Sequence, residues 1–415
     1  MTQLMRFLAA LALFQLLSVV SALAQDAVLF SPELPPTSAA VRKAEAISLL
    51  SDYLQYPSLS GEEDRVGQFL ADYCKAQGLH ITQLPSEEGS MNFAATLYPL
   101  EVDKPVIWLQ HHMDVVPAAE TEGWRHPPFS GRVALDTIWG RGALDNKGMG
   151  VMQLMALLNL KESLDTTELV YNVGLLCVSN EEVGGLLGSR LVIDKALTDL
   201  KPLVVFGEGG AGLTGVLSRK PDKPVFGISV AEKTVLWLKL DLQLNSYGHG
   251  AAPAPEYANK LMIHALSRLE GRKLDFEFNR VNKRMFRRMG RAEGGIRGFV
   301  ISHLNWAIFR PFIKGTIQRD PMLQALTTNT VTVTKLENSP GPHNQISSTA
   351  TAYLDCRLQP NTAPKAFIRK LERLLDQPRI SISVVNQTPQ ARPSPTNDFT
   401  MPWPKPFRKT CRPLR

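Results

Sequence analysis

The chain has few cysteines and few long apolar stretches. Its four cysteines, Cys74, Cys177, Cys356 and Cys411, are widely spaced and form no Cys-x-x-Cys pair. Small exported domains that depend on disulfides are far richer in cysteine, so we expect no disulfide framework, although one or two bridges stay open. Beyond the first residues no segment reaches about eighteen consecutive apolar residues, and we therefore expect no stable membrane span.

Acidic residues are outnumbered, since 39 Asp and Glu face 46 Lys and Arg and the formal net charge is +7. Such a balance can indicate nucleic-acid binding, but the basic residues are spread along the chain, with one denser patch at Arg280–Arg297. We interpret this patch as a solvated basic face and expect no nucleic-acid partner. The length of 415 residues, with 44% hydrophobic and 20% charged residues, predicts an ordinary globular protein of two domains.

Residues Met1–Ala24 have the pattern of a secretory signal peptide. Arg6 precedes a mostly apolar run from Phe7 to Val20, and Ala22-Leu23-Ala24 forms an Ala-x-Ala cleavage site. We therefore expect the protein to be exported, to the periplasm or the medium.

Short apolar runs alternate with segments of helical periodicity over residues 25–220. The pattern predicts strands at 81–84, 93–97, 106–109, 170–178 and 203–206, and helices at 39–54, 60–77 and 146–160. This alternation favours an α/β domain with a mixed, largely parallel sheet.

Reactive side chains stand at the carboxyl ends of these strands or at a helix start: His112, Asp114, Asp145, Glu181, Glu182 and Glu208. Open α/β sheets keep their active sites at this edge. Taken singly, Asp145 is explained as a helix N-cap, and the two adjacent glutamates as solvated surface charge. Their common placement favours a divalent-metal site instead.

His112 and Asp114 are two residues apart, so in extended backbone they point to the same side. We predict that His112 binds metal and that Asp114 accepts a hydrogen bond from its second ring nitrogen. His111 is expected to point to the other face. Glu181 and Glu182 point in different directions, so one can hold metal while the other acts as general base.

Three motifs resemble those of a di-zinc hydrolase family: His112-Met113-Asp114-Val115-Val116-Pro117, Gly140-Arg141-Gly142-Ala143-Leu144-Asp145-Asn146-Lys147-Gly148 and Asn180-Glu181-Glu182-Val183-Gly184-Gly185. The family includes aminoacylase, glutamate carboxypeptidase, acetylornithine deacetylase and succinyl-diaminopimelate desuccinylase, and the chain looks most like its carboxypeptidase S-like branch. The resemblance covers about residues 46–396. It implies a metal-dependent hydrolase that cleaves the amide bond of peptides or N-acyl amino acids with a free carboxylate.

The resemblance also implies two Zn²⁺ ions per subunit, activating a water and polarising the scissile carbonyl. His112 and Glu208 would hold one ion and Glu182 the other, with Asp145 bridging both. Glu181 would be the general base.

In the same family pattern His249 would donate a hydrogen bond to the oxyanion. Asn344 and Arg357 would contact the substrate, since an arginine suits a free carboxylate. For Arg357 an ion pair with a neighbouring acid is the open alternative.

Residues 221–387 form a second predicted domain after a linker-like stretch at Lys220–Pro224. The pattern predicts strands at 236–244, 330–336, 350–358 and 380–385, and helices at 253–269 and 364–375. It indicates an α+β domain inserted into the catalytic domain, which the resemblance implies is a lid and often a homodimer surface. We interpret residues 271–326 as loop-like decoration of that lid, with helices that cover the cleft or touch membrane as the alternative.

Residues 388–415 depart from the family pattern. The resemblance implies a further stretch that completes the catalytic sheet and supplies a histidine ligand, but no histidine follows His343 and residues 401–415 are too rich in proline to extend a sheet. Our hypothesis is a frameshift near Thr400. We expect an under-ligated second zinc, an unpaired sheet edge and impaired activity. The alternative function is an inactive relic or binding protein on the same fold.

Overall fold

The structure is a computed structural model that describes most of the chain. The described residues are 36–119, 122–163, 169–209, 212–245, 248–271, 276–317, 319–390 and 392–394. The predicted signal peptide and residues 401–415 lie outside them, so both stay predictions. The chain divides into two compact units at Gly209 and Gly210, before the predicted linker. We call their described parts the first unit, residues 36–209, and the second unit, residues 212–394.

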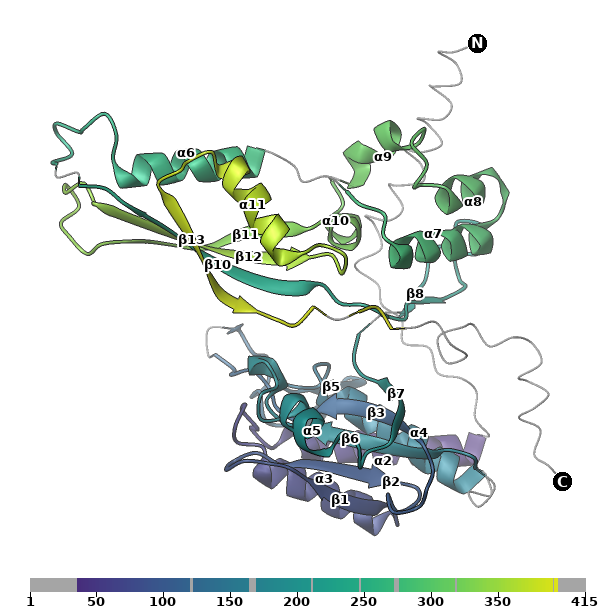
Figure 1. The fold of residues 1–415 in the computed structure, drawn as a ribbon. Helices are drawn as coiled ribbons and strands as arrows, with labels where there is room; N and C mark the ends of the chain where they lie inside the picture. Colours follow the sequence, from purple (N-terminus) through teal and green to yellow (C-terminus); the bar gives the residue numbers. More distant parts are fainter. Residues whose placement is uncertain are drawn as a thin grey trace. The chain divides into compact units, whose positions relative to one another are not determined.

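The first unit is built on a five-stranded sheet of order β1-β2-β6-β3-β7 among the described residues (Figure 1). The strands are β1 (His80–Leu84), β2 (Asn92–Thr96), β3 (Val106–His112), β6 (Asn172–Val178) and β7 (Pro202–Phe206). β6, β3 and β7 run parallel, whereas β1 and β2 pair antiparallel. The predicted mixed sheet of an α/β domain is confirmed. Its parallel strands are those whose carboxyl ends carry the predicted metal ligands.

Helices cover both faces of this sheet. The elements are α2 (Pro36–Leu54), α3 (Asp64–Ala76), α4 (Lys147–Ser163) and α5 (Ser189–Ala196), with a small hairpin of β4 (Arg132–Ala134) and β5 (Thr137–Trp139). The first three helices share one core with the sheet, and α5 packs on the opposite face against Trp108 of β3. In α3 the buried residues Val66, Leu70 and Cys74 lie four positions apart, which is the apolar stripe of an amphipathic helix. This packing holds β3 and β6 in place, and the predicted ligands His112 and Glu182 stand at or just after the carboxyl ends of these two strands.

The second unit is built on a four-stranded antiparallel sheet of order β11-β12-β10-β13 among the described residues. Its elements are β8 (Gly212–Leu213), β9 (Val225–Phe226), β10 (Thr234–Gln243), α6 (Ala258–Gly271), β11 (Thr330–Asn338), β12 (Thr349–Leu358), α11 (Pro364–Leu375) and β13 (Ile380–Gln387). Leu236, Leu238 and Leu240 of β10 are buried against α6 and α11, whereas Trp237 is 43% exposed. The alternation gives one wet face, as the sequence predicts.

The segment at 280–327 of the second unit is helical. It contains α7 (Arg280–Glu293), α8 (Gly295–Ser302), α9 (Arg310–Ile317) and α10 (Pro321–Thr327), so the loop-like interpretation is wrong. The buried positions of α7 are Asn282, Phe286, Gly290 and Glu293. Val281, Met285, Phe286 and Met289 recur at helical spacing between basic residues, so α7 is an amphipathic helix whose period the loop-like interpretation overlooked.

Cys74, Cys177 and Cys356 are buried and form no disulfide among the described residues. Within the same residues, no helix is both long and apolar enough to cross a membrane.

Candidate metal centre

Three neighbouring strands and one helix place the acidic side chains at one sheet edge. His112 is the last residue of β3, Glu181 follows β6 and Glu208 follows β7. Because these strands are adjacent and parallel, their carboxyl ends meet at the same edge. Asp145 stands just before α4, where the helix dipole favours a carboxylate.

The imidazole of His112 forms the centre of this group. Its Nε2 atom lies 3.1 Å from Asp145 Oδ1, 3.5 Å from Glu208 Oε2 and 3.8 Å from Glu181 Oε2. The ligand atoms of His112, Asp145 and Glu208 all lie within 4.8 Å of one another. An imidazole nitrogen with carboxylate oxygens is a donor set that divalent zinc accepts. The structure therefore brings together three of the four predicted ligands in an arrangement that fits a metal ion.

Glu182 is not a member of this three-residue group. Its backbone N–H donates to Asp114 Oδ2 at 3.0 Å. Burial raises the pKa of its carboxyl group, and the charge of Asp145 raises it further. Glu182 therefore lies within electrostatic reach of Asp145, and its role as ligand of a second ion stays a prediction.

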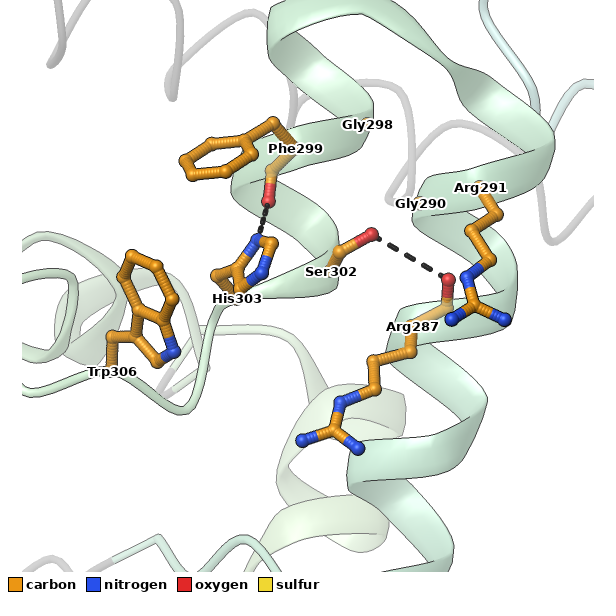
Figure 2. A pocket seen from close by; sticks show the side chains of 8 residues that line it. All are labelled: Arg287, Gly290, Arg291, Gly298, Phe299, Ser302, His303 and Trp306. Atoms are coloured by element: carbon orange, nitrogen blue, oxygen red, sulfur yellow. Dashed lines mark hydrogen bonds between the residues drawn. The ribbon is translucent and has the colours of Figure 1, made fainter.

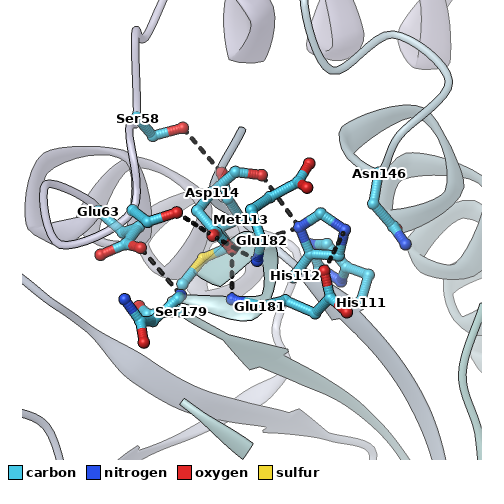
Figure 3. A network of polar contacts seen from close by, with 12 residues as sticks. Ser58, Glu63, His111, His112, Met113, Asp114, Asn146, Ser179, Glu181 and Glu182 are labelled. Atoms are coloured by element: carbon cyan, nitrogen blue, oxygen red, sulfur yellow. Dashed lines mark hydrogen bonds and ion pairs between the residues drawn. The ribbon is translucent and has the colours of Figure 1, made fainter. Parts of the chain in front are cut away.

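Asp114 is fully buried and accepts several hydrogen bonds (Figure 3). Nδ1 of His112 lies 3.0 Å from its backbone carbonyl and 3.3 Å from Oδ1. The Ser60 hydroxyl donates to Oδ2 at 2.7 Å, and the backbone N–H groups of Glu181 and Glu182 donate to the two carboxylate oxygens at 3.0 Å. Burial raises the pKa of Asp114, but these hydrogen bonds outweigh it and lower the pKa. Asp114 thus orients both the imidazole and the glutamate turn.

The chain turns sharply after β6, as the glycines in the motif predict. Asn180 has φ 63°, and Gly184 and Gly185 have φ 104° and 70°. These left-handed values are costly for most L side chains, so the turn requires glycine at the last two positions. A single 3-10 turn, Glu181–Val183, lies between them and points its first two N–H groups at Asp114.

Negative charge surrounds one imidazole in this site. Burial lowers the pKa of His112, but the hydrogen bond to Asp114 and the charges of Asp114, Glu181 and Glu208 raise it to about 9. Burial also raises the pKa of Glu181, against the opposing effect of His112. A divalent cation would relieve this repulsion between carboxylates, which is the electrostatic signature of a metal site.

We expect the affinity for a divalent metal to rise about tenfold per pH unit between about pH 6 and pH 8. The metal needs neutral His112, and with a pKa of about 9 a proton has to leave the ring throughout this range. Calorimetric titration with Zn²⁺ at several pH values would measure both affinity and proton release. The exposed His80 provides the matched control, since His80→Ala should keep the same slope. An affinity independent of pH would contradict the prediction.

His111 points into the core, away from the acidic group, as predicted. Its Nε2 atom lies 3.3 Å from the Tyr53 hydroxyl and its Nδ1 atom 3.9 Å from Cys177 Sγ. Burial, together with the charge of His112, lowers the pKa of His111 to about 3. It is therefore a neutral core residue, and Gly150 leaves room for its ring because a Cβ there would lie 2.4 Å from His111 Cδ2.

Two predicted residues of the second unit, His249 and Asn344, lie side by side. The Ala251 N–H donates to His249 Nδ1 at 3.1 Å, so the neutral ring carries its proton on Nε2. The carboxamide nitrogen of Asn344 lies 2.8 Å from that Nε2 atom, and its oxygen can turn to accept the proton. The role of His249 as a donor to an oxyanion stays a prediction.

Arg357 pairs with an acid on its own strand. Its Nε and one terminal nitrogen donate to the two carboxylate oxygens of Asp355 at 2.8 and 3.0 Å. Because the two residues are two apart on β12, they share one face of the sheet. The ion pair left open by the sequence is therefore present, and contact of Arg357 with substrate stays a prediction.

Sequence reasoning missed three polar residues that support the site. Besides Ser60, Glu63 is buried and accepts the backbone N–H of Asn180 at 2.9 Å (Figure 3). The Asn146 side chain donates to the Glu208 carboxylate. Ser60 and Glu63 have the pattern of an ordinary helix start, and nothing in the sequence shows that this turn packs beside β3 and β6.

The chain is similar in sequence to known hydrolases and peptidases. The chain is 29% identical over 298 residues to the N-fatty-acyl-amino acid synthase/hydrolase PM20D1 of Mus musculus, covering 71% of this chain and 57% of that protein. It is 28% identical over 318 residues to the probable carboxypeptidase S-like 2 of Dictyostelium discoideum, covering 72% and 56%. The chain thus spans a little over half the length of these relatives.

Two solved structures share the fold. The M20 family metallo-carboxypeptidase Sso-CP2 of Sulfolobus solfataricus superposes with a TM-score of 0.54 at 22% identity, covering 81% of this chain and 77% of that one. Human carnosine dipeptidase 1 superposes with a TM-score of 0.53 at 14% identity, covering 85% and 79%. Residues 108–397 match the sequence profile described as Peptidase family M20/M25/M40. The fold and the group of residues that fits a metal ion agree with this match, and this chain belongs to peptidase family M20/M25/M40.

Proposed function

We propose that this family hydrolase is a zinc-dependent enzyme that cleaves the amide bond of a peptide or an N-acyl amino acid with a free carboxylate. The observation that carries the proposal is the His112, Asp145 and Glu208 group with Glu181 at its edge. The names of the two relatives describe an N-fatty-acyl-amino acid synthase/hydrolase and a probable carboxypeptidase S-like protein. An amide bond close to a free carboxylate is common to both kinds of substrate.

In this proposal, residues of the first unit hold the metal ions and transfer the proton. His112, Asp145 and Glu208 would hold one ion, and Glu182 with Asp145 would hold a second. The bound ions would polarise the scissile carbonyl and acidify the attacking water. Glu181 accepts the proton of that water and returns it to the leaving amine, a task that suits its raised pKa.

The second unit supplies substrate contacts in the same proposal. His249 would donate a hydrogen bond from its Nε2–H group to the oxyanion, and Asn344 and Arg357 would contact the substrate. Such a donor contributes about 10²–10³-fold to kcat in other hydrolases. The unit would serve as the lid and as a homodimer surface.

A panel of substrates tests the proposal. We expect the chain to hydrolyse N-acyl amino acids or dipeptides at a reduced rate, because the second ion would be under-ligated, to lose this activity in a chelator and to regain it with Zn²⁺. The same compounds with an amidated carboxyl group should react at least tenfold more slowly, because an arginine fork needs the carboxylate. Equal rates for free and amidated substrates would contradict the carboxylate requirement. Full activity in a chelator-treated sample would contradict dependence on metal.

A further inference from the structure

The excess positive charge of the chain is concentrated in one helical segment. Residues 276–317 contain seven arginines and two lysines against two glutamates, a net of +7 that equals the formal net charge of the whole chain. One of the two acids, Glu293, is 3% exposed and accepts hydrogen bonds from Ser218. The charged residues of this segment are thus almost all basic, whereas positive and negative residues are equal in number in the rest of the chain.

Close packing of α7 and α8 sets the basic face beside an aromatic one. A Cβ on Gly290 would lie 2.3 Å from the backbone oxygen of Gly298, and one on Gly298 would lie 2.2 Å from that of Gly290. Only glycine allows the two helices to approach so closely. The contact places the exposed arginines of α7 next to the aromatic residues of α8 and the turn after it.

These two faces line a shallow hollow of about 550 Å³ (Figure 2). Arg287 and Arg291 of α7 form one side, and both are exposed without an ion-pair partner among the described residues. The opposite side is a run of rings in which His303 lies 4.3 Å from both Phe299 and Trp306, measured between ring centroids. The hollow thus joins two guanidinium groups to an apolar wall.

Large apolar side chains of α8 and of the segment after it face solvent, and two of them, Phe299 and Trp306, line the hollow. Ile296 is 85% exposed, Ile308 68%, Phe299 51% and Trp306 46%. A nucleic-acid site uses aromatic rings for stacking but has no use for exposed isoleucines beside them. Arginines interleaved with Ile, Phe and Trp at one surface are instead the composition of a segment that lies in the interface of a bilayer.

We propose that the α7–α8 surface binds the face of a lipid bilayer that carries anionic headgroups. Arg287 and Arg291 would engage headgroup phosphates by bidentate hydrogen bonds, and Ile296, Phe299 and Ile308 would enter the acyl boundary. This is attachment to one face of the bilayer without a span. The inference does not depend on the proposed hydrolysis.

Vesicle co-sedimentation of the full chain tests it. We expect binding to phosphatidylcholine vesicles with about 30% phosphatidylglycerol, little binding to pure phosphatidylcholine, and weakening with salt. Arg287→Glu with Arg291→Glu should lower the partition coefficient at least tenfold. Ile296→Ser with Ile308→Ser should lower it several-fold, because both side chains are exposed and the fold does not need them.

A matched charge reversal separates a local surface from net charge. Lys365→Glu with Lys370→Glu changes the charge equally on the exposed side of α11 and should keep binding within about twofold. An equal loss of vesicle binding in the arginine and the lysine double variants would overturn the proposal. Equal binding of the wild type to neutral and anionic vesicles would also overturn it. Binding of duplex DNA in place of vesicles would also overturn it. Hydrolysis of a soluble substrate should be unchanged in all these variants, which keeps this test separate from that of the enzyme.

Discussion

Replacing Glu181 by glutamine should lower kcat by about 10²–10⁴-fold and leave the first metal bound. Glutamine keeps the size of the side chain but cannot accept a proton, so only the base is removed. Glu181 Oε2 lies 3.8 Å from His112 Nε2, at the edge of the metal group, and is outside the three-residue set that fits an ion. Its raised pKa suits a group that takes a proton from water and gives it back.

Steady-state kinetics with metal analysis of the same sample would check this result. Glu88→Gln is a matched control, because Glu88 is exposed and outside the site, and it should keep full activity. If Glu181→Gln lost its metal with its turnover, Glu181 would be a ligand and the assignment of base would be wrong. If turnover persisted, the hydrolytic mechanism proposed for this site would fail. The experiment also separates an enzyme from a binding protein on this fold.

Asp114→Asn should weaken metal binding about 10–100-fold and destabilise the first unit by about 1–3 kcal/mol. The carboxylate accepts hydrogen bonds from Ser60 and from the backbone N–H groups of Glu181 and Glu182. An amide has one acceptor oxygen and brings its own N–H against one of these donors. The imidazole of His112 then loses its orientation, and the glutamate turn loses an anchor.

Acid should remove the difference in unfolding free energy between the wild type and Asp114→Asn. The pKa of Asp114 is lowered in the folded protein, so its carboxylate stabilises the fold above its unfolded pKa of about 3.9. That stabilisation is lost as pH falls through the folded value. Urea unfolding at pH 7 and at progressively lower pH would therefore show the two chains converging. Asp136→Asn, at an exposed position, should have the unfolding free energy of the wild type at every pH. A difference in unfolding free energy between the wild type and Asp114→Asn that stays constant with pH would contradict this explanation.

Strand ends were readable from the sequence because buried parallel strands are continuous apolar runs. Val106–His112 and Asn172–Val178 have this form, and the polar residues after them are the ones that meet at the sheet edge. The helices within residues 280–327 were missed for a different reason. The longest of them, α7, does repeat apolar residues at helical spacing, at Val281, Met285, Phe286 and Met289, but the basic residues between them were interpreted only as a solvated face.

Pairings between distant segments were also beyond the sequence. Ser60 meets Asp114, and Glu63 meets the backbone of Asn180, across separations of 54 and 117 residues. Arg357 had two open explanations, and the side chains on β12 show the ion pair with Asp355.

By itself, the sequence determined the kinds of ligand, the strands that carry them and the family, because all three depend on residue type and local period. Only the tertiary structure decided which acids reach the ring of His112 and which stand apart from it. It also decided that Arg287 and Arg291 of α7 line one hollow with Phe299, His303 and Trp306. Distances between residues far apart in the chain depend on how helices and strands pack, and packing is a property of the whole unit.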